Sequence, residues 1–235
     1  MSKLWRIAIP VAFFGMILGL GIFGSMYFLR AQPPNVDFTS AHPGRPVHLT
    51  LQTVGDVGPN YPNPAWVSYL VLAPNGQWVH STQYELPAYT RINVTVYEYD
   101  TGLILRNQVW SQVTGTIGDD ETVNGKTLRY VTPATLGGQA HTFTVPAMGI
   151  NVPFPGVNDD APNICEAAPC RFNSIHNIVT FSFMTGAPGQ YHWQCVFPCA
   201  AAFLDGNGGP MQTLGYMDGF LKVMPSPGHP LQVGQ

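Results

Sequence analysis

The chain has 235 residues, with 10 Lys plus Arg against 13 Asp plus Glu, which gives a formal net charge of -3. This balance provides no electrostatic attraction for nucleic acid, and we exclude that class of partner. Only 10% of the residues are charged, compared with about 25% in an average soluble domain. Because 45% are hydrophobic, a disordered protein is excluded as well. We therefore expect one globular core with an appendage.

The appendage is an uncharged apolar stretch near the amino terminus. Ile7 to Leu29 contains 23 residues without a charge, more than the roughly 20 that a helix needs to cross a hydrocarbon core. A cleaved signal peptide has a shorter apolar region that is followed by small residues, and this run has neither feature. Lys3 and Arg6 precede the run and Arg30 alone follows it, so the positive-inside bias places the amino terminus in the cytoplasm.

This stretch divides the chain into parts. We expect residues 1–30 to form a cytoplasmic tip and a single transmembrane anchor helix, with residues 7–29 in the lipid bilayer. Residues 31–46 contain several prolines and are expected to be a linker. Residues 47–235 are expected to form the globular domain. The protein is therefore predicted to be a single-pass protein of the cell membrane, with its C-terminal domain on the extracytoplasmic side.

The domain alternates apolar or β-branched residues with polar ones, which is the period of β-strands. Turn-forming Pro-Gly, Asn-Gly and Gly-Gly pairs separate these segments, and no amphipathic helix of normal length is evident. Residues 153–170 and 206–215 are expected to be surface loops. The pattern predicts an all-β sandwich or Greek-key barrel. The predicted strands are Val47–Leu51, Trp66–Leu72, Arg91–Tyr99, Thr127–Val131, His141–Val145, His176–Phe183 and Gln190–Cys195.

The four cysteines form two close pairs, Cys165 with Cys170 and Cys195 with Cys199. An even number at short spacing suggests disulfides if the domain lies outside the cytoplasm. Metal ligation is the competing use, and the spacing alone does not separate the two.

No pattern typical of a hydrolase is present, neither a Ser-His-Asp arrangement, nor a phosphate-binding glycine loop, nor an H-E-x-x-H helix. The chain instead presents, in order, His141, a strand that ends at Cys195, then Cys199, and finally Met217. Imidazole, thiolate and thioether are ligands that suit copper. A copper electron carrier needs such ligands on a rigid β scaffold, so that little rearranges when the charge changes. We expect no catalytic residue in this chain alone.

Two segments resemble a known family. The run APGQYHWQCVFPC, which ends at Cys199, is similar to the copper-site strand and loop of the cupredoxin superfamily. It is most similar to subunit II of haem-copper (cytochrome c) oxidases, whose binuclear copper A site has a Cys-x3-Cys loop after a Pro-Gly-x-Tyr strand. The run HTFTVPAMGIN, which begins at His141, resembles the family's first-histidine strand. The resemblance covers about residues 86–223, with inserts near 101–136 and 158–172, and it implies a cupredoxin-like Greek-key fold after one amino-terminal helix.

The resemblance also implies a set of metal ligands. His141 would be one imidazole ligand, and Cys195 and Cys199 would be the two thiolates that bridge the coppers. Phe197 would lend its backbone carbonyl, and Met217 would be the weak thioether ligand. Met211, on the same loop, is the alternative methionine. The first cysteine pair lies in an insert without a family counterpart, where we predict a local disulfide.

One family ligand is missing. The family has a second histidine four residues after the second cysteine, where this chain has Phe203, and a phenyl ring cannot bind metal. His176 could complete the site. His192 is a poor substitute, because it lies three residues before Cys195 on a strand and should face the other side. The site could otherwise hold one copper, or none.

Two functions follow from the resemblance. The first is a membrane-anchored, extracytoplasmic cupredoxin-like subunit of a respiratory oxidase-type complex, which carries electrons through one or two copper ions. Its partners would be other subunits of a membrane complex, among them a haem-containing oxidase subunit, with cytochrome c as a donor. The second is a metal-free structural subunit in which Cys195 and Cys199 form a disulfide. Both are expected to be non-catalytic.

Overall fold

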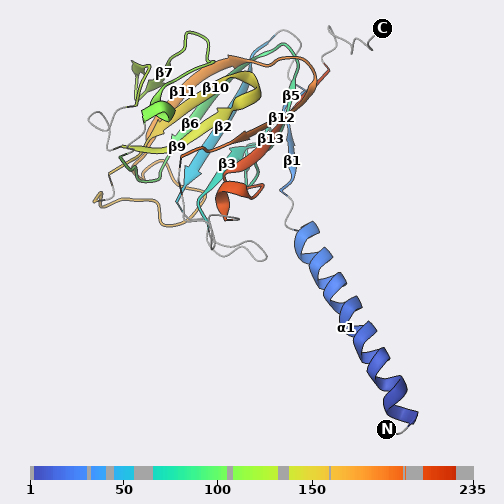
Figure 1. Ribbon diagram of the computed structural model, residues 1–235. Helices are drawn as coiled ribbons and strands as arrows, with labels where there is room; N and C mark the ends of the chain where they lie inside the picture. Colours follow the sequence, from blue (N-terminus) through green and yellow to red (C-terminus); the bar gives the residue numbers. More distant parts are fainter. Residues whose placement is uncertain are drawn as a thin grey trace, which may run out of the picture. The chain divides into compact units, whose positions relative to one another are not determined.

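The computed structural model describes residues 3–30, 33–40, 45–55, 66–104, 108–131, 138–158, 160–197, 199 and 209–225. The chain divides into two units, which are described separately. One unit holds helix α1, and the other holds the strands (Figure 1).

Helix α1 runs from Lys3 to Arg30, a length of 28 residues. Its large apolar side chains between Ile9 and Phe23 are exposed. Within the described part of the chain, no helix combines the length and apolar character that crossing a membrane requires.

The other unit is built from two β-sheets. The six-stranded sheet has the order β1 (Asn35–Asp37), β5 (Gln83–Pro87), β13 (Asp218–Met224), β12 (Gly189–Gln194), β9 (Gln139–Val145) and β10 (Ile150–Pro155). The seven-stranded sheet has the order β4 (Trp78–Val79), β3 (Ser68–Leu72), β2 (Val47–Val54), β6 (Arg91–Glu98), β11 (Asn177–Met184), β7 (Glu121–Val123) and β8 (Lys126–Leu128). Most neighbours are antiparallel, but β1 with β5, β5 with β13 and β2 with β6 are parallel. Short 3₁₀ helices between strands include η1 (Gln108–Ser111), η2 (Pro146–Met148) and η4 (Pro210–Gln212).

The inner faces of the two sheets share one hydrophobic core. Along β6, Val94 and Val96 are buried and alternate with partly exposed residues, as the strand period requires. They belong to the same core cluster as Phe143 of β9 and Trp193 of β12, which lie in the other sheet. The two sheets therefore form a sandwich. Glu98 takes the next inward position on β6 and is fully buried, which places a carboxyl group inside this core.

The structure confirms a mostly β fold. The predicted strands correspond to β2, β3, β6, β8, β9, β11 and β12. Residues 153–155, predicted to be loop, instead belong to β10, and prolines are tolerated there because β10 lies at a sheet edge. β1 lies within residues 31–46, where Val36 and Phe38 are buried.

Both predicted inserts carry structure of their own. Strands β7 and β8 extend the seven-stranded sheet at its edge. In the second insert, Cys165 and Cys170 form the predicted disulfide. Gln52 of β2 fixes this loop through two hydrogen bonds, because its amide donates to the Cys170 carbonyl and accepts from the Cys170 N–H, at 3.0 and 2.9 Å.

Candidate metal centre

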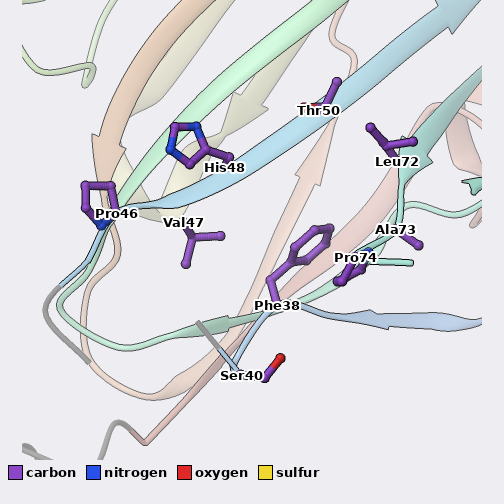
Figure 2. A pocket seen from close by; sticks show the side chains of 9 residues that line it. All are labelled: Phe38, Ser40, Pro46, Val47, His48, Thr50, Leu72, Ala73 and Pro74. Atoms are coloured by element: carbon purple, nitrogen blue, oxygen red, sulfur yellow. The ribbon is translucent and has the colours of Figure 1, made fainter. Parts of the chain in front are cut away.

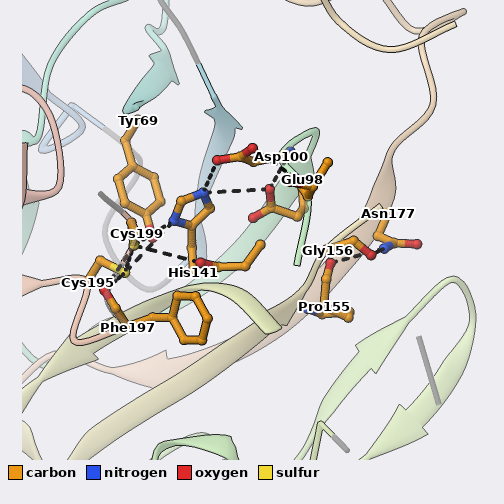
Figure 3. Close-up of polar contacts among 12 residues, drawn as sticks. Tyr69, Glu98, Asp100, His141, Pro155, Gly156, Asn177, Cys195, Phe197 and Cys199 are labelled. Atoms are coloured by element: carbon orange, nitrogen blue, oxygen red, sulfur yellow. Dashed lines mark hydrogen bonds and ion pairs between the residues drawn. The ribbon is translucent and has the colours of Figure 1, made fainter. Parts of the chain in front are cut away.

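Three potential metal ligands from distant parts of the sequence meet inside the sandwich. His141 lies on β9, Cys195 directly follows the neighbouring strand β12, and Cys199 is four residues further on. Their donor atoms all lie within 4.8 Å of one another (Figure 3). His141 Nδ1 is 2.9 Å from Cys199 Sγ and 3.9 Å from Cys195 Sγ, and the two sulfurs are 2.7 Å apart. This cluster is therefore a candidate site for a single metal ion or for a small metal centre.

Strand alternation explains why these side chains face the interior. On β12, Trp193 is buried and His192 is exposed, so Cys195, two residues after Trp193, returns to the inner side. The Thr142 N–H donates a hydrogen bond to Cys195 Sγ at 3.3 Å. The register of β9 against β12 therefore sets the position of the sulfur beside His141.

The structure places the Phe197 carbonyl beside the two thiols and the backbone of Met217 beside Cys195. The Phe197 carbonyl oxygen is 3.1 Å from Cys199 Sγ and 3.6 Å from Cys195 Sγ. Met217 is fully buried, and its carbonyl accepts a hydrogen bond from the Cys195 N–H at 2.9 Å. The backbone of Met217 is thus hydrogen-bonded to that of Cys195.

The two histidines considered for the missing ligand lie elsewhere. His176 Nδ1 is 2.8 Å from the Ser174 carbonyl, and the ring contacts Tyr99, so His176 does not join the cluster. His192 faces outward, as predicted, and its Nε2 is 2.7 Å from Asp218 Oδ2. Phe203, at the position of the missing histidine, lies outside the described residues.

Two carboxyl groups behind His141 were not predicted as part of the site. Asp100 Oδ2 is 3.1 Å from His141 Nε2, and Glu98 Oε1 is 4.0 Å from the same nitrogen. A signal for Glu98 was present in the sequence, because its position continues the inward apolar series of the strand Arg91–Tyr99. No comparable signal existed for Asp100, which follows the strand in a turn.

The environment shifts the pKa values of the two thiols in opposite directions. Burial raises the pKa of Cys195, but hydrogen bonds with Cys199 and His141 outweigh burial, and the net pKa lies well below the usual value. Burial and the Cys195 sulfur together raise the pKa of Cys199 well above the usual value. Burial lowers the pKa of His141, but the Glu98 charge and the Asp100 hydrogen bond raise it overall. Of the two thiols, Cys195 is therefore the one that loses its proton more readily.

The two sulfurs are not bonded to each other. Their separation of 2.7 Å exceeds the roughly 2.05 Å of a disulfide, and both cysteines are free. Two thiols and one imidazole form a soft donor set of the kind that binds copper or zinc. Burial of Cys195 and His141 keeps this donor set away from bulk water.

A surface cavity in the β domain has a different character. Its lining is largely apolar and includes Phe38, Val47 and Leu72, with His48 as the titratable side chain (Figure 2). It shares no residue with the cluster of His141 and the two thiols. The candidate metal donors therefore lie outside this cavity.

Comparison with known proteins gives no family assignment. No family model and no curated protein matches the chain. Similar solved structures include a histidine-to-methionine variant of rusticyanin, with 14% identity and a TM-score of 0.34 over 85% of this chain and 92% of that chain. Rusticyanin from Thiobacillus ferrooxidans has 15% identity and a TM-score of 0.33 over 87% of this chain and 94% of that chain. Because these TM-scores are low, we draw no conclusion about this chain from the similarity.

Proposed function

We propose that the β domain is a copper-binding electron carrier of the cupredoxin type. The observation that carries this proposal is that His141 Nδ1 and the thiols of Cys195 and Cys199 form one cluster, in which His141 and Cys195 are buried. These donors fit copper, because thiolate and imidazole ligands on a β scaffold are typical of copper electron-transfer sites. When bound, copper would supply one-electron redox chemistry.

The surrounding core supports this role. Tyr69 is fully buried, its ring centroid lies 6.3 Å from that of His141, and its hydroxyl donates to the Thr142 carbonyl at 2.8 Å. Trp193 is fully buried beside Tyr69, with ring centroids 5.0 Å apart, and its indole N–H donates to the Thr82 carbonyl at 3.0 Å. Such packing excludes water and holds the ligand strands in place, so that little rearranges when an electron arrives.

The number of ions follows from the number of imidazoles. The described part of the chain brings one histidine to the thiols, which favours one ion held by His141, Cys195 and Cys199. The Phe197 carbonyl and Met217 are the candidates for weak ligands. A binuclear centre like that of oxidase subunit II would require a second imidazole.

A metal-free scaffold is the second candidate function. It is favoured by the short distance of 2.7 Å between the sulfurs of Cys195 and Cys199, because loss of two electrons and two protons to an oxidant would join them as a disulfide. The domain would then serve as a structural subunit of a membrane complex.

The proposal includes an anchor and partners. Residues 7–29 would span the cell membrane once and hold the β domain on the extracytoplasmic side, an idea that rests on the 23 uncharged residues of this stretch. The complex would be of the respiratory oxidase type, with cytochrome c as electron donor and a haem-containing subunit as acceptor. The low content of charged residues, 10%, supports burial of the surface by such neighbours.

The copper proposal is tested by metal analysis with optical and electron paramagnetic resonance spectra. The full chain is purified without chelator or reductant, together with the variants Cys195→Ser and His141→Ala. His176→Ala is the matched control, because it removes a histidine outside the cluster. One copper with an intense thiolate charge-transfer band, or two coppers with shared hyperfine coupling, supports the carrier if both site variants lose the signal and the control keeps it.

Two results of the metal analysis would overturn the copper carrier. Absence of copper, with Cys195 and Cys199 oxidised to each other, overturns the carrier and supports the scaffold. Zinc in place of copper also overturns it, because zinc has no redox chemistry.

The anchor is tested separately with phospholipid vesicles. The full chain should float with vesicles after an alkaline wash, and Leu18→Arg should shift it to the soluble fraction, because an arginine at a helix centre costs about 2.5 to 3.5 kcal/mol on insertion. Release of the unaltered chain by the wash would contradict the anchor.

A further inference from the structure

The carboxylate of Asp100 is fixed behind the histidine of the proposed metal site. Its Oδ2 is 3.1 Å from His141 Nε2, and its Oδ1 accepts a hydrogen bond from the Thr101 N–H at 2.8 Å. The Asp100 N–H donates to Glu98 Oε1 at 2.8 Å, and the Asp100 carbonyl accepts from the Val157 N–H at 2.9 Å. Both the side chain and the backbone of Asp100 are thus held in place (Figure 3).

The direction of the hydrogen bond follows from the chemistry of the two groups. Asp100 offers only carboxyl oxygens to its neighbours: Oδ1 accepts from the Thr101 N–H at 2.8 Å, and Oδ2 lies 3.1 Å from His141 Nε2. A carboxylate only accepts hydrogen bonds, so His141 Nε2 must carry the proton. The other nitrogen, Nδ1, then faces the two thiols, at 2.9 and 3.9 Å.

We propose that Asp100 is a positioning residue for the metal centre, which fixes the His141 ring so that Nε2 is protonated and Nδ1 is directed at the metal. This inference rests on the proposed copper function for its redox consequence but not for its effect on the imidazole. A histidine ligand whose second nitrogen donates to a carboxylate is held in orientation and becomes a more basic ligand. The nearby negative charge also favours the cupric over the cuprous state.

The space for this carboxylate depends on Gly55, at the end of β2. A Cβ atom at Gly55 would lie 2.9 Å from Asp100 Oδ1 and 3.3 Å from its Cγ. Only the end of the Asp100 side chain has to move to relieve this contact. Gly55→Ala is therefore a variant that displaces the carboxylate while every proposed ligand and Asp100 itself remain present.

The first measurement is made on the metal-free, reduced protein by nuclear magnetic resonance. We expect a slowly exchanging Nε2–H resonance from His141, because this proton is buried and bonded to a carboxylate. Asp100→Leu should abolish the slow exchange, Gly55→Ala should accelerate exchange, and Asp100→Asn should retain protection, because its amide oxygen still accepts a hydrogen bond.

The second measurement is the reduction potential of the copper-loaded protein. Loss of a carboxylate behind a histidine ligand costs roughly 10-fold in affinity for the metal. If only the cupric state loses this affinity, Asp100→Asn should raise the reduction potential by about 59 mV, which corresponds to a tenfold change in the equilibrium constant for one electron. The control is Glu85→Gln, which removes a carboxylate of the same exposure, 25% against 24%, that pairs with Lys222 instead of His141.

The outcomes separate the two proposals. Slow exchange that persists in Asp100→Leu overturns the positioning role. So does a potential that shifts equally in Glu85→Gln and Asp100→Asn. If the unaltered protein takes up no copper, the proposed function fails, and the His141 resonance in the three variants still decides the role of Asp100.

Discussion

The buried carboxyl group of Glu98 makes the stability of the metal-free domain depend on pH. Burial raises its pKa from 4.5 to about 8, although the charge of His141 acts in the opposite direction. Between these two values, the unfolded chain loses a proton that the folded chain retains. The contribution of Glu98 to the free energy of unfolding should therefore fall as the pH rises from about 4.5 and become level above about 8.

The magnitude follows from the same two values. Each pH unit between 4.5 and about 8 corresponds to about 1.4 kcal/mol, so the loss is at most about 5 kcal/mol. Glu98→Gln keeps the shape and the oxygen that accepts from the Asp100 N–H, but it cannot ionise. We expect this variant to be equal to or less stable than the parent near pH 4.5, because a buried amide N–H₂ needs partners, and more stable above pH 8.

Urea unfolding of the reduced, metal-free parent and variant between pH 4.5 and 9 measures this effect. The expected sign is a difference in unfolding free energy that increasingly favours Glu98→Gln as the pH rises. The reasoning is refuted if the difference is the same at every pH, because Glu98 would then ionise alike in the folded and unfolded chains.

Other changes have equally definite outcomes. Glu121 is buried, and neither of its carboxylate oxygens has a hydrogen-bond partner among the described residues. Because burial raises the pKa of this group, Glu121→Gln should increase the free energy of unfolding by an amount that grows above pH 4.5 in urea titrations. The same variant should leave copper binding unchanged. At Gly219, an added Cβ would overlap the backbone oxygen of Thr82, the residue before the adjacent strand β5. Gly219→Ala should therefore cost about 1 to 3 kcal/mol or more and lower the melting temperature, and a neutral result would contradict the close approach. Replacing Cys165 and Cys170 together by Ser should cost about 2 to 3 kcal/mol on unfolding, with an unchanged copper spectrum, whereas loss of the spectrum would show that the loop supports the site.

The sequence by itself determined the class of fold and indicated His141, Cys195 and Cys199 as candidate metal donors. Strand alternation is a local property, so segments such as Arg91–Tyr99 could be recognised without knowledge of their neighbours. The Cys-x3-Cys spacing of Cys195 and Cys199 and the context of His141 could be recognised in the same way. The sequence also indicated that His192 faces away from Cys195, because residues three apart on a strand lie on opposite sides.

Only the tertiary structure decided what lies around these donors. Asp100 and His141 are 41 residues apart, and they meet because the turn after β6 is placed beside β9 by contacts that no local pattern encodes. The same applies to Glu98, whose inward position was visible in the strand but whose partner was not. Periodicity fixes which side of a strand a residue takes, whereas the packing of one sheet on another fixes which residues from distant segments touch. For this protein, local motifs identified the thiols and the imidazole, whereas sheet packing decided that they meet and that two carboxyl groups lie behind the imidazole.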